Sequence, residues 1–233
     1  LEITPIYGVK NNEANDIEYL SPRWMQMYSF VCEEGKRLGL DIDMNNGTGW
    51  PFGGPEVSLE DAASKVIFLK YTLDGGSRLS EPIVVTDKKQ KPVAKLLRLM
   101  AYSSDGKVLN LTSRVDKETG ELNWTAPEGK AWKLVAAFLG KTFQKVKRAA
   151  PGGEGYVMNH FSKKAVANYF SRFDRAFASS GVPAPGTFFN DSYEVYGADW
   201  TPDFFFSSAR RRGYKLENHL LELTGEKSDI RAR

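Results

Sequence analysis

The chain has 233 residues, 41% of them apolar, which is enough to bury a substantial core and form one or two domains. Its 32 basic and 29 acidic residues leave a net charge of only +3, and basic clusters such as Lys88-Lys89 are short, which argues against a nucleic-acid partner. No apolar run approaches the roughly 18 residues of a membrane span. The single cysteine, Cys32, excludes an intrachain disulfide, and its place in a helical pattern favours a buried, inert thiol over a nucleophile.

The first forty-odd residues predict a strand–helix–strand unit. A short apolar run at 1–7 indicates a buried strand. The helix that follows is expected to start at the N-cap Ser21 with Pro22 in its first turn, and to end at Gly39. A second strand is expected at 40–44. Such a unit implies parallel strands joined by a right-handed crossover.

The pattern changes after residue 58. The capping box Ser58-Leu59-Glu60-Asp61 predicts a helix that reaches Tyr71. From there to Lys147 the sequence is strand-like and rich in turns, with hairpin signals at Asp105-Gly106 and Thr119-Gly120. Strands are expected at 82–86, 95–102, 107–111 and 132–143. This stretch predicts a small antiparallel β domain inserted between two α/β units.

Helical periodicity returns at Ser162, where apolar residues recur at spacings of three and four. A third parallel strand is expected at 187–190. Another helix is expected to start at Thr201-Pro202-Asp203 and to end at Gly213. The three arginines at 210–212 complement the dipole of its last turn, which favours a helix terminus over a ligand site.

Parallel strands alternating with helices suit either a doubly wound sheet or a (β/α) barrel. No G-x-G-x-x-G motif follows a strand, and the polar and aromatic residues gather after strand ends, where barrel enzymes build their sites. Because a barrel needs eight strands and three are expected here, we predict a partial (β/α)8 barrel of the TIM type. Residues 1–71 and 148–233 are assigned to the barrel, and 72–147 to the inserted β-rich domain.

The first candidate site cluster follows the second expected strand. Asn45 and Asn46 supply amide donors and acceptors, and Trp50 and Phe52 supply flat apolar faces. A sugar ring has hydroxyl groups around its rim and apolar C–H faces, so it needs that combination. An ordinary Gly/Pro-rich loop with a structural tryptophan is the alternative.

The second cluster follows the third expected strand and is rich in carboxylates and aromatic rings. Its candidate substrate-binding and catalytic residues are Asn190, Asp191, Tyr193, Glu194 and Tyr196. Glycoside hydrolysis needs one carboxylic acid to protonate the leaving oxygen and a second carboxylate to act on water or on the sugar carbon. We favour Glu194 as the acid, with Asp191 second. Asp199 is expected to be structural, in the cap of the next helix.

The third cluster joins the insert to the following helix and contains Arg148, Glu154 and His160. A structural role for His160 is the alternative to substrate binding. Because Arg148 and Glu154 belong to the same cluster, the sequence favours neither role over the other. No His/Cys set has zinc spacing, and no Ser-His-Asp pattern is present. No cofactor is expected; calcium, held by Asp and Asn oxygens, is the one metal considered. The loops that carry Trp50, Arg148, His160 and Glu194 are expected to converge on one concave surface.

These clusters, in this order, resemble the catalytic region of bacterial α-L-rhamnosidases of glycoside hydrolase family 106. The stretches that carry the resemblance are Glu2-Ile3-Thr4-Pro5-Ile6-Tyr7-Gly8, Asn45-Asn46-Gly47-Thr48-Gly49-Trp50-Pro51-Phe52-Gly53-Gly54, Arg148-Ala149-Ala150-Pro151-Gly152-Gly153-Glu154-Gly155, His160-Phe161-Ser162 and Asn190-Asp191-Ser192-Tyr193-Glu194. The resemblance implies a larger secreted enzyme, periplasmic or extracellular, in which β-sandwich domains follow the barrel. It also implies hydrolysis of terminal α-L-rhamnosides of polysaccharides with inversion, with Glu194 as one active-site carboxylate and its partner beyond Arg233.

Two departures from the family pattern stand out. Asn159 occupies a position where such relatives are expected to carry an aspartate, and Phe204-Phe205-Phe206 replaces a more polar helix face, which suggests an apolar contact surface. Two rival functions remain open: another barrel glycosidase of retaining type, and a catalytically silent sugar-binding protein. Because only one carboxylate of the pair is argued for within residues 1–233, the isolated chain is expected to be inactive.

Overall fold

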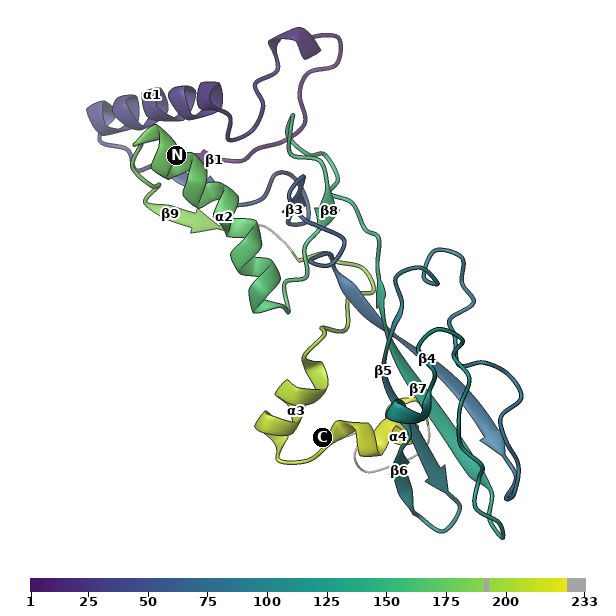
Figure 1. The fold of residues 1–233 in the computed structure, drawn as a ribbon. Coiled ribbons are helices and arrows are strands. Elements are labelled where there is room, and N and C mark those ends of the chain that lie inside the picture. The colour runs from purple at the N-terminus through teal and green to yellow at the C-terminus, as the bar shows by residue number, and fades with distance from the viewer. Residues whose placement is uncertain (191–192, 226–233) are drawn as a thin grey trace. The chain divides into compact units, whose positions relative to one another are not determined.

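The computed structural model describes residues 1–190 and 193–225, which fold into two compact units (Figure 1). The parallel-sheet unit comprises Leu1–Ala63 and Thr142–Ala198. The antiparallel-sheet unit comprises Ser64–Lys141 and the chain from Asp199 onward. The chain therefore leaves the first unit after Ala63, returns to it at Thr142 and leaves it again after Ala198. The three-part domain division predicted from the sequence stays a prediction.

Three parallel strands and two long helices form the parallel-sheet unit. Its elements are β1 (Glu2–Ile3), the 3-10 helix η1 (Glu13–Asn15), α1 (Pro22–Leu38), β2 (Asp43–Asn45), β3 (Gly53–Gly54), β8 (Tyr156–Val157), α2 (Lys163–Ser180) and β9 (Thr187–Phe189). Strand β2 lies between β1 and β9 and pairs in parallel with both, so the three predicted parallel strands are confirmed. Strands β3 and β8 form a separate antiparallel pair.

Helix α1 begins and ends where the sequence predicts, and α2 begins where predicted. The Ser21 hydroxyl accepts the Trp24 N–H at 3.2 Å at the start of α1, and Gly39 ends this helix with a φ of 69° that favours glycine. Ser162 caps α2 in the same way. Helices α1 and α2 lie side by side next to the sheet (Figure 1). Their inward faces bury Tyr28 and Phe173 in one core with Met44 of β2.

A four-stranded antiparallel sheet dominates the antiparallel-sheet unit. Its elements are β4 (Ser64–Leu73), β5 (Lys95–Ser103), β6 (Val108–Asn110), the 3-10 helix η2 (Thr112–Arg114), β7 (Trp132–Lys141), α3 (Phe204–Arg212), the 3-10 helix η3 (Leu216–His219) and the short α4 (Leu220–Leu223). The strand order is β4-β7-β5-β6, and all neighbours pair antiparallel. The predicted turn at Asp105-Gly106 joins β5 to β6, and Gly106 has a φ of 90°.

The central strand β7 is buried on both faces from Leu134 onward. Its side chains alternate between two buried clusters, Trp132, Leu134 and Ala136 on one face and Val135 and Ala137 on the other. The second face packs against residues that follow Ala198, among them Phe205 and Leu220. This sheet is therefore covered on both faces around β7.

The predicted helix from Ser58 to Tyr71 is wrong. The Ser58 hydroxyl does accept the Asp61 N–H at 3.2 Å, so the capping signal forms, but it closes a turn only. Strand β4 starts at Ser64 and pairs with β7 along its whole length. The segment VIFLKYT is rich in β-branched and aromatic residues, and its pairing with β7 overrides the local helix signal.

The strand predicted at 82–86 is also wrong, although its apolar residues are buried. Ile83 donates its N–H to the carbonyl of Gly120 at 2.8 Å, and both Ile83 and Val85 pack into the core of the antiparallel-sheet unit. Pro82 has no N–H to offer a ladder. The segment therefore packs against the sheet without joining it.

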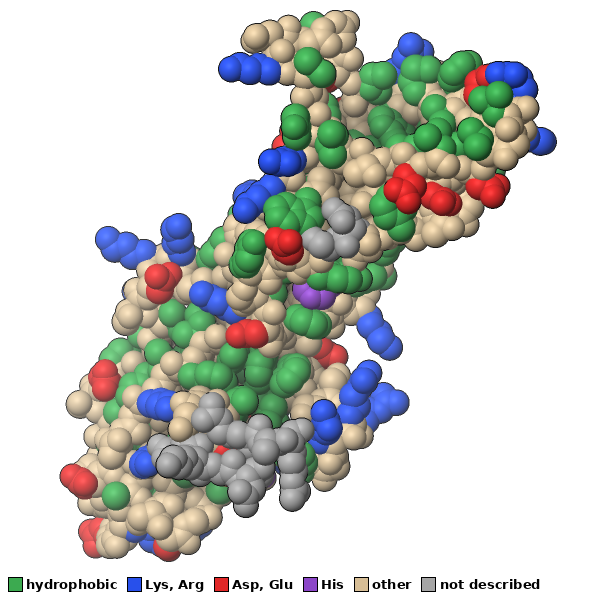
Figure 2. Space-filling model, turned by 180° about the vertical axis from the view of Figure 1, so that it is seen from behind, with side chains coloured by type: hydrophobic (Ala, Val, Ile, Leu, Met, Phe, Trp, Pro, Cys, Tyr) green, Lys and Arg blue, Asp and Glu red, His purple; other side chains and the backbone are tan. Residues whose placement is uncertain are grey.

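The apolar surface expected at 204–206 is limited to one residue. Phe205 is buried, Phe204 packs against the same cluster, and only Phe206 is exposed, at 70%. The basic triplet 210–212 occupies the last turn of α3 as predicted. Lys and Arg side chains are scattered among other types on the face in view in Figure 2. Among the described helices, none combines the length and apolar character needed to cross a membrane.

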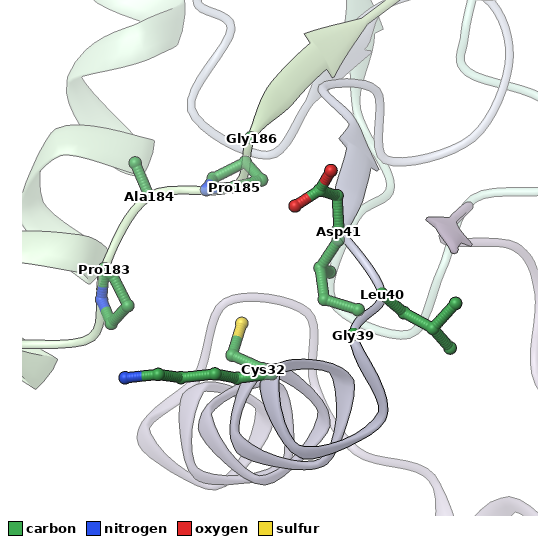
Figure 3. A pocket seen from close by; sticks show the side chains of 10 residues that line it. Cys32, Gly39, Leu40, Asp41, Pro183, Ala184, Pro185 and Gly186 are labelled. Carbon is green, nitrogen blue, oxygen red and sulfur yellow. The ribbon is translucent and has the colours of Figure 1, made fainter.

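A pocket of about 370 Å³ lies at the N-terminal ends of β2 and β9 (Figure 3). Cys32 and Asp41 line it on one side, and the segment Pro183–Gly186 lines it on the other. Cys32 is half-buried rather than buried as predicted, because it faces this gap between α1 and the proline-containing segment. The candidate functional residues lie at the opposite end of the same strands.

Candidate active site

Two asparagine side chains stand at the carboxyl ends of neighbouring parallel strands. Asn45 of β2 pairs with Phe189 of β9, and the next residue, Asn46, donates its N–H to the Phe189 carbonyl at 3.1 Å. Asn190 follows directly after Phe189. The Oδ1 of Asn46 and both amide atoms of Asn190 are buried and have no hydrogen-bond partner among the described residues. Buried amides are nearly always paired, so these unpaired atoms mark a candidate site at the edge where α/β folds place their sites.

Asn45 has a different role from its neighbour. Its side chain is 4% exposed, and its Oδ1 accepts the Gly47 N–H at 2.7 Å, which closes a turn within the loop. The carbonyl of Asn46 accepts the Tyr169 hydroxyl at 2.6 Å. Burial raises the pKa of Tyr169, so the phenol stays protonated and remains a donor. The hydrogen bonds of Asn45 and Tyr169 thus fix the backbone of the loop that contains Asn46.

An aromatic cluster connects the three sequence clusters. The ring of Tyr193 lies 6.2 Å from that of Phe52 and 5.2 Å from that of His160, measured between centroids. Phe52 in turn stacks on Tyr169 at 6.1 Å. Tyr193 is 61% exposed, so its ring offers an accessible apolar face. Such faces pack against the C–H surface of a sugar.

A cation links Trp50 to Glu194. The ammonium of Lys147 lies 5.7 Å from the ring centroids of both Trp50 and Tyr196. The Tyr196 hydroxyl donates to Oε2 of Glu194 at 3.1 Å, and this hydrogen bond raises the pKa of Tyr196. The Glu194 side chain is exposed, so the described residues do not themselves provide the burial that favours a protonated acid.

The segment 193–196 is anchored to the rest of the unit by one glutamine. The Gln144 amide donates from Nε2 to the Glu194 carbonyl at 2.9 Å, and its Oε1 accepts the Tyr196 N–H at 2.8 Å. Gln144 and Lys147 were absent from the candidates drawn from the sequence. Four polar residues within 144–148, next to a glycine-rich turn, were the available signal, but they did not specify a partner.

Two predicted residues lie apart from these contacts. Arg148 is exposed, and its guanidinium lies 6.0 Å from the Tyr7 ring, while its carbonyl accepts the Tyr7 N–H at 3.1 Å. Glu154 is exposed in the turn before β8. Asp191, the second candidate acid, lies outside the described residues. Trp50 and Glu194 are therefore linked through Lys147 and Tyr196, and His160 contacts Tyr193, the residue before Glu194. The concave surface expected to include Arg148 stays a prediction.

The loop between β2 and β3 is held by a buried threonine. Thr48 is 1% exposed, and its hydroxyl lies 2.9 Å from the Gly53 carbonyl and 2.6 Å from the Gly153 carbonyl. It thereby joins the first sequence cluster to the third. Asn159, which replaces an expected aspartate, is buried, and its Oδ1 accepts the Phe161 N–H at 3.1 Å just before α2. Among the described residues, no three His, Cys, Asp or Glu side chains gather as a metal site.

Burial lowers the pKa of His160 from its ordinary value, and a hydrogen bond with the Met158 backbone opposes this only in part. The unfolded state therefore binds more protons near pH 6.5 than the folded state, and stability must rise with pH through this range. We expect acidification from pH 7.5 to 5.5 to lower the free energy of unfolding less in His160→Gln than in the unchanged protein. Urea unfolding at both pH values measures this difference, and an equal loss in both proteins would contradict it.

Comparison with known proteins identifies the family. The profile of glycoside hydrolase family 106, described as alpha-L-rhamnosidase, matches residues 88–232, more than half of the chain. The chain belongs to this family. The matched region includes the third and second sequence clusters, and both units contribute to it.

Two relatives define how much of a longer protein the chain resembles. A protein of Formosa agariphila named "Putative beta-glucuronidase" is 27% identical over 91% of this chain, which corresponds to 22% of that protein. The structure of a rhamnosidase from Novosphingobium sp. PP1Y matches 90% of this chain and 37% of its own length, with a TM-score of 0.72 and 17% identity. The likeness to the solved structure shows a shared fold, and the chain spans well under half of either relative.

Proposed function

We propose that the protein is a glycoside hydrolase that removes terminal α-L-rhamnosyl units from polysaccharides, and that this chain supplies part of its active site. Membership of the alpha-L-rhamnosidase family supports the reaction class. The observation that carries the proposal for this chain is the set of buried, unpaired amide atoms of Asn46 (Oδ1) and Asn190 (Oδ1 and Nδ2) at adjoining strand ends.

These amides suit a sugar because of their chemistry and position. A carboxamide offers two N–H donors and a carbonyl acceptor, which can each pair with a hydroxyl group. The hydroxyl groups of a pyranose would give hydrogen-bond partners to Asn46 Oδ1 and to the two amide atoms of Asn190. An apolar ligand would leave these atoms unpaired. The exposed ring of Tyr193 supplies the apolar face beside them. The sugar ring is therefore proposed to lie over the C-terminal edge of β2 and β9.

The parallel sheet is proposed to be part of a (β/α)8 barrel, with the β-rich segment 72–147 inserted into it. Three adjoining parallel strands with helices α1 and α2 beside them support this architecture, as does the fold shared with a rhamnosidase. A secreted, periplasmic or extracellular enzyme would meet polysaccharide substrates directly.

Glu194 is proposed as the general acid. It lies four residues beyond Asn190 on the same loop, and Tyr196 and Gln144 fix its backbone and side chain. Inversion or retention both require a second carboxylate, which is proposed to lie outside residues 1–233. The chemistry proposed needs only carboxylates and water, without a cofactor. The 233-residue chain by itself is accordingly expected to show no turnover.

Glucuronide hydrolysis is the second candidate, because one relative bears the name of a beta-glucuronidase. A uronic acid carries a carboxylate that would require a cation at the site. Lys147 lies beside Tyr196, which bonds to Glu194, but its ammonium already lies against two aromatic rings. A neutral deoxy sugar therefore fits the described residues better than a uronic acid.

The full-length protein is expected to hydrolyse an aryl α-L-rhamnoside in preference to an aryl β-D-glucuronide. Asn46→Ala and Asn190→Ala should each lower kcat/KM on the rhamnoside about 5- to 150-fold, since each removes hydrogen bonds worth about 1–3 kcal/mol. Asn168→Ala, which removes an exposed amide of α2 bonded to Asp61, serves as the control. Faster hydrolysis of the glucuronide would support the second candidate function instead. Sugar binding without turnover would indicate a catalytically silent sugar-binding protein.

A further inference from the structure

The antiparallel-sheet unit contains a pocket of its own, separate from the strand-end residues of the other unit. It has a volume of about 450 Å³ and lies between β4 and the segment that carries α3, η3 and α4. This volume falls within the range of small-molecule sites, roughly 300–1,000 Å³.

Aromatic rings form much of the pocket wall. Phe68 of β4 and Phe204 of α3 line it. Trp200, which precedes α3 in the chain, and Tyr214, which follows it, line it as well. The Trp200 ring is 6.3 Å from Phe68 and 4.2 Å from Phe204 between centroids. The pocket is therefore bounded by flat apolar surfaces.

One buried donor in this wall has no acceptor. Trp200 is only 4% exposed, and its indole Nε1 has no hydrogen-bond partner among the described residues. A buried tryptophan N–H ordinarily finds a partner. A ligand oxygen that reaches Nε1 would satisfy this donor, whereas a hydrocarbon would leave it unpaired.

Polar groups are distributed around the same space. Phe204, Ser208 and Arg212 are spaced by four residues, so they share one face of α3. Asp199 accepts the Val66 N–H at 2.9 Å with Oδ1, and its second oxygen is not used in that bond. The opposite charges of Asp199 and Arg212 favour a ligand without net charge.

We propose that this pocket binds one neutral pyranose unit and is a second carbohydrate-binding site of the protein. The C–H faces of the sugar would pack against Phe68 and Phe204. Its hydroxyl groups would accept from Trp200 Nε1 and Arg212 and donate to Asp199. This site does not depend on the proposed reaction, because it lies in the other unit and uses none of the candidate catalytic residues.

The indole N–H of Trp200 provides a direct readout. The chain has 5 tryptophans, so the indole region of a ¹H–¹⁵N spectrum is simple, and the signal lost in Trp200→Phe assigns Trp200. L-Rhamnose, added to millimolar concentration, is expected to shift this signal in a saturable manner. A Trp200 signal that does not move with L-rhamnose, while that of Trp50 does or while none does, would overturn the proposal.

Two neighbouring serines on α3 give matched variants. Ser208→Leu places a larger side chain in the pocket, whereas Ser207→Leu changes a serine whose hydroxyl donates to Asp203 instead. We expect Ser208→Leu to abolish the saturable shift of Trp200 and Ser207→Leu to retain it. Equal shifts in both variants would mean that the sugar contacts Trp200 from elsewhere and would overturn the pocket assignment. The titration of the unchanged chain stands even if a variant fails to fold.

Discussion

Replacing Glu194 with glutamine in the full-length protein is expected to lower kcat/KM on an alkyl or polysaccharide rhamnoside by about 10²–10⁴-fold. Glutamine keeps the size of the side chain and can still accept the Tyr196 hydroxyl, which donates to Glu194 at 3.1 Å. It cannot donate a proton to a leaving oxygen. The loss should therefore come from chemistry rather than from a change in loop structure.

The leaving group separates this role from a purely structural one. Hydrolysis of an activated aryl rhamnoside releases a stable phenolate, which needs little acid assistance. The same variant should therefore lose much less activity on this substrate. Glu33→Gln is a matched control, because Glu33 is a carboxylate of α1 that accepts only the Ser29 hydroxyl in the described structure. Equal, modest losses on both substrates would move the acid role to Asp191 or to another residue.

Tyr196→Phe provides a further check on the same geometry. The Glu194 carboxylate raises the pKa of the Tyr196 phenol through their hydrogen bond, so this donor stays protonated at neutral pH. Its removal should leave Gln144 as the remaining anchor of the segment. A small loss in kcat/KM, similar on both substrates, is expected because the acid itself is retained.

The sequence predicted the parallel-sheet unit well because its signals are local. Ser21, Gly39 and Ser162 act through hydrogen bonds or backbone angles within a few residues, and the structure places each at a helix end. The parallel pairing of β1 with β2 then followed from the connection through α1. These features need no information from distant parts of the chain.

The errors occur where a distant partner decides the structure. The cap predicted at Ser58 forms, but the residues that follow form strand β4 because they pair with β7. The contacts of Lys147 are with the rings of Trp50 and Tyr196, which the sequence does not place beside it. The sequence suggested Asn46 as a sugar ligand by residue type alone. Its unpartnered oxygen becomes visible only when β2 and β9 are paired.

The glycines of the loop before β4 are a further case in which a distant partner decides the structure. The sequence indicates that other atoms approach their backbone closely, but it does not indicate which atoms these are. Gly53 pairs with Val157 and Gly54 with Tyr156 in the β3–β8 ladder. A Cβ on Gly53 would overlap the carbonyl oxygen of Tyr156, which is backbone and cannot rotate away. A Cβ on Gly54 would lie 3.4 Å from Cγ2 of Thr48, an ordinary van der Waals contact.

Gly53→Ala is therefore expected to lower the free energy of unfolding by about 3 kcal/mol or more, and Gly54→Ala by less than about 1 kcal/mol. The two variants add the same methyl group to adjacent residues of one strand, so intrinsic propensity cancels in the comparison. Urea unfolding followed by tryptophan fluorescence measures both. In the full-length protein, Gly53→Ala should also weaken sugar binding, because β3 continues the loop that carries Asn46 and Trp50. Similar stabilities for the two variants would show that β3 and β8 do not approach closely, and the loop would then need another support than this strand pair.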